Sequence, residues 1–363
     1  MRNKRLIKPA QGDSPDYFQG RGAQINTRNR FLQQSYVQEH AEGIDEWGQP
    51  DEATIYLEEN AKTLVNKVDS PDVGMWYSMN PYQGCEHGCI YCYARNAHEY
   101  WGYSAGSDFE HKILVKKNAA QLLRKFLDRK DWEVVPISLS GNTDCYQPAE
   151  RKFRITRSLL EVALEYRQPI GILTKNAGVL RDADLLREMS SMRLVTVLVS
   201  LTTFNEDLRR AMEPRTTTAH QRLKVLETLS SWGIPTGVMT APMIPGLNDH
   251  EMPALLKAAK EAGASRAGYT VVRLNGAIKL LFHDWLYKNF PDRADKVWHQ
   301  IEACHGGKVN DSEFGRRMSG EGGEADVIRQ QFRIHTQRLG LNSERLSLDT
   351  SLFRRPGEQM RLF

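Results

Sequence analysis

Asn80-Pro-Tyr-Gln-Gly-Cys-Glu-His-Gly-Cys-Ile-Tyr-Cys-Tyr93 is the stretch with the most specific chemistry, and the fold prediction starts from it. Cys85, Cys89 and Cys92, three of the five cysteines of the chain, fall within it at the spacing C-x3-C-x2-C. Iron–sulfur clusters are held by cysteine thiolates, so three of them on one short loop can bind three irons of a [4Fe-4S] cluster. The fourth iron would then have no protein ligand nearby, and an open metal position is where a cofactor binds.

The same cysteines admit two other interpretations, a set of buried thiols or a zinc site completed by His87 or His98. Zinc sites usually combine a C-x2-4-C pair with a second pair of ligands much further along the chain. The sequence has no such second pair downstream, so the spacing favours the cluster.

Composition describes a globular protein whose cysteines do not form a disulfide framework. The 363 residues are 40% hydrophobic and 26% charged, enough for one large domain or two smaller ones. The formal net charge of +4 is a mild basic excess, compatible with nucleic acid or another anionic partner. Free thiols favour a reducing cytoplasm. The start of the chain lacks the apolar run of a signal peptide, and no stretch has the roughly 18 apolar residues of a membrane span.

The chain divides into three regions by composition. Residues 1–72 form a polar extension, which we interpret either as a partly ordered tail or as a basic arm that contacts an anionic substrate. Residues 73–275 carry the alternating pattern described next. Residues 276–363 have no further strand pattern, and we predict that they form a helical cover.

Short apolar runs alternate with helix-sized amphipathic segments through the middle region. This alternation is typical of a parallel sheet with helical crossovers. We therefore predict an α/β fold, a partial (β/α)6 TIM-like barrel, with a doubly wound sheet as the alternative that periodicity leaves open. The six predicted strands are Met75–Met79, Val134–Leu139, Ile170–Leu173, Leu194–Val199, Thr236–Ile244 and Ala267–Leu274.

The cysteine spacing and the aromatic Tyr91 before the last cysteine resemble the signature of the radical S-adenosylmethionine (SAM) enzymes, C-x3-C-x-aromatic-C. The resemblance covers roughly residues 75–275 and implies a [4Fe-4S] cluster on Cys85, Cys89 and Cys92 with SAM at its open iron. In this family the reduced cluster cleaves SAM to methionine and a 5′-deoxyadenosyl radical, which abstracts hydrogen from the substrate.

The resemblance also implies where SAM would lie, because ligands bind at the carboxyl ends of parallel strands. The loop after the second strand would hold the amino group, although it lacks the family's usual G-G-E sequence. Cationic and polar side chains after the third and fourth strands would hold the carboxylate and ribose, and Pro242-x-Ile244-x-Gly246 resembles the family's adenine-binding G-x-I-x-G. These expectations concern Tyr91, Asn142, Thr143, Asp144, Lys175, Ser200, Arg215, Ile244 and Gly246.

Within the superfamily, three phrases resemble the branch of spore photoproduct lyase and the DNA-repair-photolyase-like enzymes. They are Asn80 to Arg95 with Asp108-Phe-Glu110, Thr143-Asp-x-Tyr-Gln-Pro-x-Glu150, and Thr174-Lys175. The lyase is expected to carry a hydrogen-donating cysteine where this chain has Gly141. Cys145 lies four residues later, and we interpret Cys145 and Tyr146 as a candidate hydrogen donor and radical relay.

Three functions therefore remain open. The first is a radical enzyme that acts on nucleic acid, with a flavodoxin- or ferredoxin-type electron donor. The second applies the same chemistry to a peptide, a protein or a small metabolite. The third is a zinc-stabilised binding protein without enzymatic activity.

Overall fold

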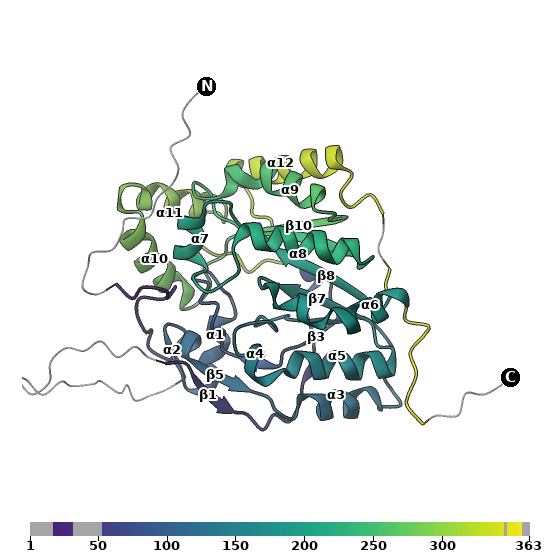
Figure 1. Ribbon diagram of the computed structural model, residues 1–363. Helices are drawn as coiled ribbons and strands as arrows, with labels where there is room; N and C mark the ends of the chain where they lie inside the picture. The colour runs from purple at the N-terminus through teal and green to yellow at the C-terminus, as the bar shows by residue number, and fades with distance from the viewer. Residues whose placement is uncertain (1–16, 32–52, 345–346, 358–363) are drawn as a thin grey trace, which may run out of the picture.

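A computed structural model describes residues 17–31, 53–344 and 347–357 (Figure 1). Its main sheet has seven strands in the order β10-β9-β8-β7-β6-β3-β2. All neighbours are parallel except β2, which runs antiparallel to β3 at the edge. The sheet is not closed, so the predicted partial barrel is confirmed. The strands are β2 (Val65–Lys67), β3 (Tyr77–Met79), β6 (Ile137–Leu139), β7 (Ile170–Thr174), β8 (Val195–Ser200), β9 (Thr236–Met243) and β10 (Arg266–Val271).

Helices connect the parallel strands and cover the outer side of the sheet (Figure 1). Two of these helices are capped at their N-termini by side chains. Asn205 accepts hydrogen bonds from two backbone amides of α7, and Thr218 accepts one from the Gln221 amide of α8. The carboxyl ends of the strands face the side that carries α1, α7 and α10. The connecting helices are α3 (Ala119–Leu127), α5 (Ile155–Tyr166), α6 (Ala183–Ser191), α7 (Glu206–Met212), α8 (Ala219–Ser231) and α9 (Met252–Glu261).

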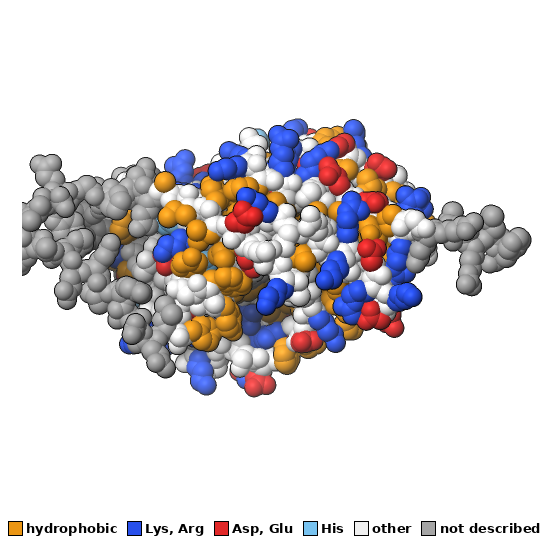
Figure 2. Space-filling view, turned by 90° about the horizontal axis from the view of Figure 1, so that it is seen from below, with side chains coloured by type: hydrophobic (Ala, Val, Ile, Leu, Met, Phe, Trp, Pro, Cys, Tyr) orange, Lys and Arg blue, Asp and Glu red, His pale blue; other side chains and the backbone are white. Residues whose placement is uncertain are grey.

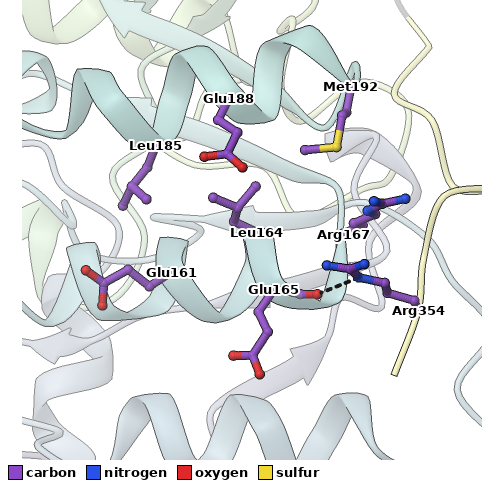
Figure 3. Close-up of a pocket in the computed structure, with 8 residues that line it drawn as sticks. All are labelled: Glu161, Leu164, Glu165, Arg167, Leu185, Glu188, Met192 and Arg354. Atoms are coloured by element: carbon purple, nitrogen blue, oxygen red, sulfur yellow. Dashed lines mark hydrogen bonds between the residues drawn. The ribbon is translucent and has the colours of Figure 1, made fainter. Parts of the chain in front are cut away.

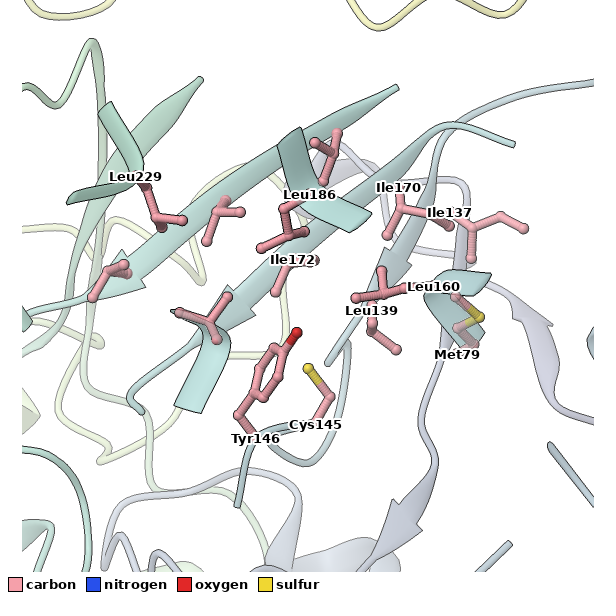
Figure 4. Packing of buried hydrophobic residues seen from close by; sticks show 14 of the residues in the cluster. Met79, Ile137, Leu139, Cys145, Tyr146, Leu160, Ile170, Ile172, Leu186 and Leu229 are labelled. Atoms are coloured by element: carbon pink, nitrogen blue, oxygen red, sulfur yellow. The ribbon is translucent and has the colours of Figure 1, made fainter. Parts of the chain in front are cut away.

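The main hydrophobic core lies between the sheet and these helices (Figure 4). In β7 the side chains of Ile170 and Ile172 are buried while their neighbours are half-buried, as expected for a strand whose side chains alternate between two faces. Leu160 and Leu186 meet them from the helices and are fully buried. Each such side chain contributes about 1.5–3 kcal/mol through burial. The core therefore fixes the strands, and the strands fix the loops at their carboxyl ends.

A second, three-stranded sheet lies under the cysteine loop, and the sequence patterns did not predict it. Its order is β1-β5-β4, with β1 (Ile55–Glu58) parallel and β4 (Tyr82–Gln83) antiparallel to β5 (Lys112–Val115). Because β4 ends two residues before Cys85, this sheet anchors the start of the loop. Three short helices follow nearby: α1 (Arg95–His98), α2 (Asp108–His111) and α4 (Glu150–Phe153).

The C-terminal region is helical, with α10 (Ile278–Asn289), α11 (Ala294–Ala303) and α12 (Gly323–Leu339), and α12 packs against α9. Between α11 and α12, a loop of residues 309–318 runs across the open side of the barrel. It accepts hydrogen bonds from the end of β10 and reaches Asp72 before β3, where the Arg317 Nε lies 2.6 Å from the carboxylate. The division at residues 72 and 275 stays a prediction. No helix in the described part of the chain is long and apolar enough to cross a membrane.

Candidate functional site

The cysteine loop joins β4 to α1 through consecutive tight turns. The Cys85 amide donates to the Phe109 carbonyl at 2.8 Å, and the Gly88 and Cys92 amides donate to the Cys85 and Cys89 carbonyls, each at 3.3 Å. Gly88 has φ +66°, and a Cβ there would lie 2.7 Å from the Glu110 carboxylate. The position thus requires glycine both for its backbone conformation and for the close approach.

Arg95 holds this loop from inside the protein. Its guanidinium is fully buried and donates to the Cys89 carbonyl at 2.9 Å and to the Gly88 carbonyl at 3.0 Å. It also pairs with Glu110 at 2.5 Å and donates to the carbonyls of residues 105 and 106. A guanidinium presents five donors in a fixed fork, so one side chain can tie three segments together. Sequence reasoning had placed Arg95 in the motif without assigning it this role.

The N-terminal segment 17–31 packs directly on the cysteine loop. The backbone amides of Gly22 and Ala23 donate to the Glu110 carboxylate at 3.2 and 2.8 Å. A Cβ on Gly22 would lie 1.8 Å from the Gly88 carbonyl oxygen, so the two backbones touch. This part of the predicted extension is therefore folded against the loop, whereas residues 1–16 and 32–52 lie outside the described residues.

The three thiols are close together and largely shielded from water. Cys85 and Cys89 are 6% and 7% exposed, and Cys92 is half-buried. Burial raises the pKa of Cys85, and the neighbouring Asp144, Cys89 and Cys92 raise it further. Burial also raises the pKa of Cys92, against the opposing charge of Arg95. Buried thiols become thiolates when a metal centre supplies positive charge, so the three residues fit an iron–sulfur cluster.

Both histidines of the zinc alternative have other contacts. The His87 ring lies 3.4 Å from the Asp144 carboxylate through Nδ1 and 3.2 Å from the Asn176 amide through Nε2. His98 packs edge-on against Phe109 with ring centroids 5.6 Å apart. Among the residues described, no three His, Cys, Asp or Glu side chains converge as a single metal ion requires.

The loop after β6 is bonded to the cysteine loop on both sides of Cys85. The Gln147 amide nitrogen donates to the Gly84 carbonyl at 3.1 Å, and its oxygen accepts from the Glu86 amide at 3.0 Å. Gln147 is fully buried. It fixes the position of the first thiol and is a second residue whose role the sequence did not reveal.

The three residues expected to bind the amino group of SAM use their side chains within the protein. Asp144 accepts from the Thr174 hydroxyl at 2.8 Å and from the Lys175 amide at 2.7 Å, which joins the ends of β6 and β7. Burial alone would raise the pKa of Asp144, but His87 and these donors hold it at about 2. Thr143 donates to the Tyr82 carbonyl at 2.6 Å, and the Asn142 amide group donates to Gln83 at 3.2 Å.

Tyr91 is the aromatic residue of the cysteine motif, and it is bonded to a buried ion pair. Its hydroxyl donates to Glu213, which also accepts from the Arg222 guanidinium at 2.6 Å. Glu213 and Arg222 are at most 1% exposed. Arg222 in turn donates to the Ser200 carbonyl at 2.9 Å, so the end of β8 belongs to the same network. At Ser200, the group that takes part in this network is the backbone carbonyl and not the side-chain hydroxyl.

Lys175 and Arg215 are the cations expected to meet the carboxylate of SAM. The Lys175 ammonium lies 6.0 Å from the centre of the Tyr91 ring. Burial raises the pKa of Cys89, and the positive charge of Lys175 acts against this rise. Arg215 follows Glu213, and its backbone amide donates to the His87 carbonyl at 3.4 Å. Within the described ranges neither side chain forms an ion pair, although the charge of Lys175 lowers the pKa of the buried Glu213.

Of the two residues expected after β9, Ile244 lies in the same region, whereas a Cβ on Gly246 would face Gln300 and Val297 of α11. Ile244 is fully buried in an apolar cluster that includes Cys89 and Tyr91. Gly246 has φ +77°, and its amide donates to the Asp249 carboxylate at 2.8 Å. The loop after β9 is therefore adjacent to the cysteine loop, as the resemblance implies.

Cys145 and Tyr146 lie in the main hydrophobic core, with Leu139 and Ile172 (Figure 4). Cys145 is fully buried, and the Tyr146 hydroxyl donates to Asp182 at 3.0 Å. Both side chains thus belong to the main core, whereas Cys85, Cys89 and Cys92 belong to two other apolar clusters. Their interpretation as hydrogen donor and radical relay receives no support from their positions.

A surface pocket lies between α5 and α6, in the outer helical layer (Figure 3). Arg354, from the C-terminal segment, closes one side of it by donating to the Glu165 carbonyl at 3.2 Å. None of the predicted site residues lines this pocket, which is formed by Glu161, Leu164, Glu165, Arg167, Leu185, Glu188, Met192 and Arg354.

Comparison with known proteins agrees with the fold and the loop. Residues 79–259 match the profile of the radical SAM superfamily. An uncharacterised protein of Mycobacterium tuberculosis is 33% identical over 234 residues, which cover 64% of this chain and 69% of that protein. An uncharacterised protein of Methanocaldococcus jannaschii is 33% identical over 192 residues, covering 53% and 68%. The chain belongs to the radical SAM superfamily.

Among solved structures, spore photoproduct lyase complexed with dinucleoside spore photoproduct is similar in fold. The TM-score is 0.59 at 15% sequence identity, and the match covers 79% of this chain and 80% of the lyase chain. At this identity the similarity concerns the fold, and the partial barrel is shared.

Proposed function

We propose that this protein is a radical SAM enzyme whose cluster is bound by Cys85, Cys89 and Cys92. The observation that carries the proposal is the packing of three neighbouring, shielded thiols on a loop that Arg95 and Gln147 hold from two sides. When bound, the [4Fe-4S] cluster and SAM supply reductive cleavage of SAM and a 5′-deoxyadenosyl radical.

The protein's own residues would bind and orient SAM. Lys175 and Arg215 supply the charges for its carboxylate, because a carboxylate is bound best by Lys or Arg donors. Ile244 and the ring of Tyr91 give its adenine an apolar wall. The Tyr91 ring is held in place because its hydroxyl is bonded to Glu213.

We propose a flavodoxin- or ferredoxin-type electron donor, since iron–sulfur potentials extend to about −700 mV and a reductant of low potential is required. The exposed Tyr93 and the half-buried Cys92 mark the part of the loop nearest to solvent. Free thiols and a reducible cluster suit a reducing compartment, and we propose the cytoplasm as the location.

For the substrate we propose nucleic acid, on the basis of the fold shared with a lyase that binds a dinucleoside photoproduct and of the net charge of +4. On the face that Figure 2 shows, Lys and Arg side chains are interspersed with Asp and Glu, so the proposal depends mainly on the shared fold. A peptide, a protein or a small metabolite is the second candidate, and it predicts that nucleic-acid binding is absent or insensitive to salt.

Cofactor cleavage by cysteine variants tests the enzyme class. Reconstituted anaerobically and reduced with dithionite, the wild type should release 5′-deoxyadenosine from SAM. Cys85→Ala, Cys89→Ala and Cys92→Ala should abolish this release, while Cys304→Ala, which removes a buried thiol outside the loop, should retain it. Release by the three loop variants at the wild-type rate would overturn the proposal.

A further inference from the structure

The turn from Asp144 to Gln147, in the loop after β6, contacts the cysteine loop on both sides of Cys85. The Gln147 backbone amide donates to the Asp144 carbonyl at 3.3 Å, which closes the turn. The Gln147 side chain is bonded to the residues before and after Cys85. At the other end of the turn, the Asp144 carboxylate lies 3.4 Å from Nδ1 of the His87 ring. Both end residues of the turn therefore hold the loop around Cys85.

The position of the proton on the His87 ring follows from its neighbours. The Asn176 side chain accepts a hydrogen bond from the Gly178 amide through Oδ1 at 2.8 Å, so its amide nitrogen faces the ring. That nitrogen lies 3.2 Å from Nε2 of His87, and an amide nitrogen can only donate. Nε2 is therefore the acceptor, and the ring proton is on Nδ1, the atom that faces Asp144.

The Asp144 carboxylate is fixed by donors from its own loop and from the end of β7. It accepts from the Thr174 hydroxyl at 2.8 Å, the Lys175 amide at 2.7 Å and the Tyr146 amide at 2.9 Å. The Thr174 hydroxyl has to donate to it, because its oxygen already accepts from the Asn176 amide at 3.0 Å. A carboxylate with three such donors is held in one place, so it can orient a ring that faces it.

The contact between Asp144 and His87 acts mainly through charge, because 3.4 Å is longer than an ordinary hydrogen bond. The two side chains are 10% and 1% exposed, and screening by solvent is weak for buried groups. His87 lies two residues from each of Cys85 and Cys89. The orientation of its ring therefore bears on the positions of both thiols.

We infer that Asp144 is a positioning residue for the cluster, because it orients His87 between two of the cluster cysteines and places a negative charge beside the first of them. Groups that contact the ligands of a metal site orient those ligands and tune the metal. The reduction potential of an iron–sulfur cluster depends on nearby charge, and a carboxylate lowers it by opposing the added electron. This inference rests on the proposed function, and it gives Asp144 a role other than binding the SAM amino group.

Redox potentiometry of the full-length, reconstituted protein, followed by electron paramagnetic resonance, tests the inference. Asp144→Asn keeps the shape of the side chain and removes its charge. It should increase the equilibrium constant for one-electron reduction about tenfold, which raises the potential by about 59 mV, and it should change the g values recorded without SAM. Asp349→Asn is the matched control, because it removes a carboxylate paired with Arg193 in the C-terminal segment. It should leave the potential and the g values unchanged.

Two variants of His87 test the positioning separately from the charge. His87→Asn keeps an N–H donor near the position of Nδ1 and should retain the wild-type g values. His87→Ala removes the donor while Asp144 keeps its charge, so the g values should change. This pair of variants decides the question even if Asp144→Asn binds no iron.

Wild-type potential and g values in Asp144→Asn with a full complement of iron, or wild-type g values in His87→Ala, would overturn the inference. The response of the wild-type signal to SAM is recorded alongside. If the wild-type cluster forms and responds to SAM, the positioning role fails alone and the proposed function stands. A wild type without a cluster after reconstitution would overturn the proposed function and this inference with it.

Discussion

Glu213 and Arg222 form a buried ion pair that positions Tyr91 in the cysteine motif. Burying two charges costs free energy of desolvation unless each charge has several hydrogen-bond partners, and both Glu213 and Arg222 have several. Glu213 also accepts from the Thr202 hydroxyl at 3.0 Å, and Arg222 donates to the Thr217 carbonyl at 2.7 Å. The network links the cysteine loop to the end of β8 and the start of α8. Removing one charge should therefore affect both stability and the site.

Glu213→Gln should lower the free energy of unfolding by about 3–5 kcal/mol, because it leaves the Arg222 charge buried without its partner. Urea denaturation measures the effect. Glu227→Gln is the control, since it breaks a similar ion pair with Lys224 on the surface and should cost at most about 1 kcal/mol.

The difference in the free energy of unfolding between the wild type and Glu213→Gln should change with pH in a definite direction. Burial would raise the pKa of Glu213, but Arg222 and Lys175 outweigh burial and hold it at about 2, below the ordinary 4.5. A carboxyl group whose pKa is lower in the folded than in the unfolded protein stabilises the fold fully above its unfolded-state pKa. This contribution is lost as the pH falls towards its folded-state pKa. The difference in the free energy of unfolding between the wild type and Glu213→Gln should thus shrink as the pH falls from about 4.5 to 2. A gap that widens in acid would contradict the assigned charge.

Cys145 should behave as a core residue. In cluster-free native protein, alkylation by iodoacetamide should modify Cys92 first, since it is the one cysteine of the five that is not buried, and should reach Cys145 only on unfolding. Peptide mapping by mass spectrometry reads out the order. Modification of native Cys145 at a rate close to that of Cys92 would show that its thiol is accessible and would restore it as a hydrogen-donor candidate.

At the scale of elements, the cysteine loop depends on segments far apart in sequence. Segment 17–31, which we call the arm, meets α1 and α2 at Glu110. The Glu110 carboxylate binds Arg95 of α1 and the backbone amides of Gly22 and Ala23 of the arm. The loop is thereby held by segment 17–31 as well as by Gln147. The arm is part of the site's support rather than an appendage to it.

Gly22→Ala should detach the arm, because its Cβ would overlap the Gly88 carbonyl and the backbone there cannot yield. The expected loss of stability is about 2 kcal/mol, from overpacking and the lost bonds to Glu110. Trypsin should then cleave faster after Arg21, which is 8% exposed in the intact arm.

The matched control for the arm is Gly323→Ala, since a Cβ on Gly323 meets nothing within 4 Å. Its tryptic pattern should equal that of the wild type. Unchanged cleavage after Arg21 in Gly22→Ala would mean that the arm is not held as described.

Sequence reasoning predicted the elements that carry strong patterns. The six parallel strands of the main sheet were predicted because each lies in a short, mainly apolar run of sequence. The small sheet was missed because β4 has two residues and pairs with a strand thirty residues away, which leaves no periodicity. Arg222 did leave a signal, since it occupies an apolar-face position of α8 with Ala219, Val225 and Leu229. A charge at such a position indicates a buried partner, here Glu213.

At the scale of the whole molecule, the open barrel is completed by segments from both sides of it in the sequence. The loop 309–318 bridges the last strand to Asp72 before the first parallel one, and the arm covers the cysteine loop. The strand ends then form one edge, where the Lys175 ammonium after β7 lies 6.0 Å from the centre of the Tyr91 ring in the cysteine motif. This arrangement gathers the residues proposed to hold the cluster and SAM at one edge of the sheet.

Electron paramagnetic resonance of the dithionite-reduced protein, with and without SAM, tests this account most directly. Three cysteine ligands leave one iron open, so we predict a reduced [4Fe-4S] signal whose g values change when SAM is added, with about four irons per chain. Cys304→Ala should leave the SAM-free signal in place, because it removes a buried thiol outside the cysteine loop. Stoichiometric zinc without iron after reconstitution, or a cluster signal that does not respond to SAM, would contradict the account.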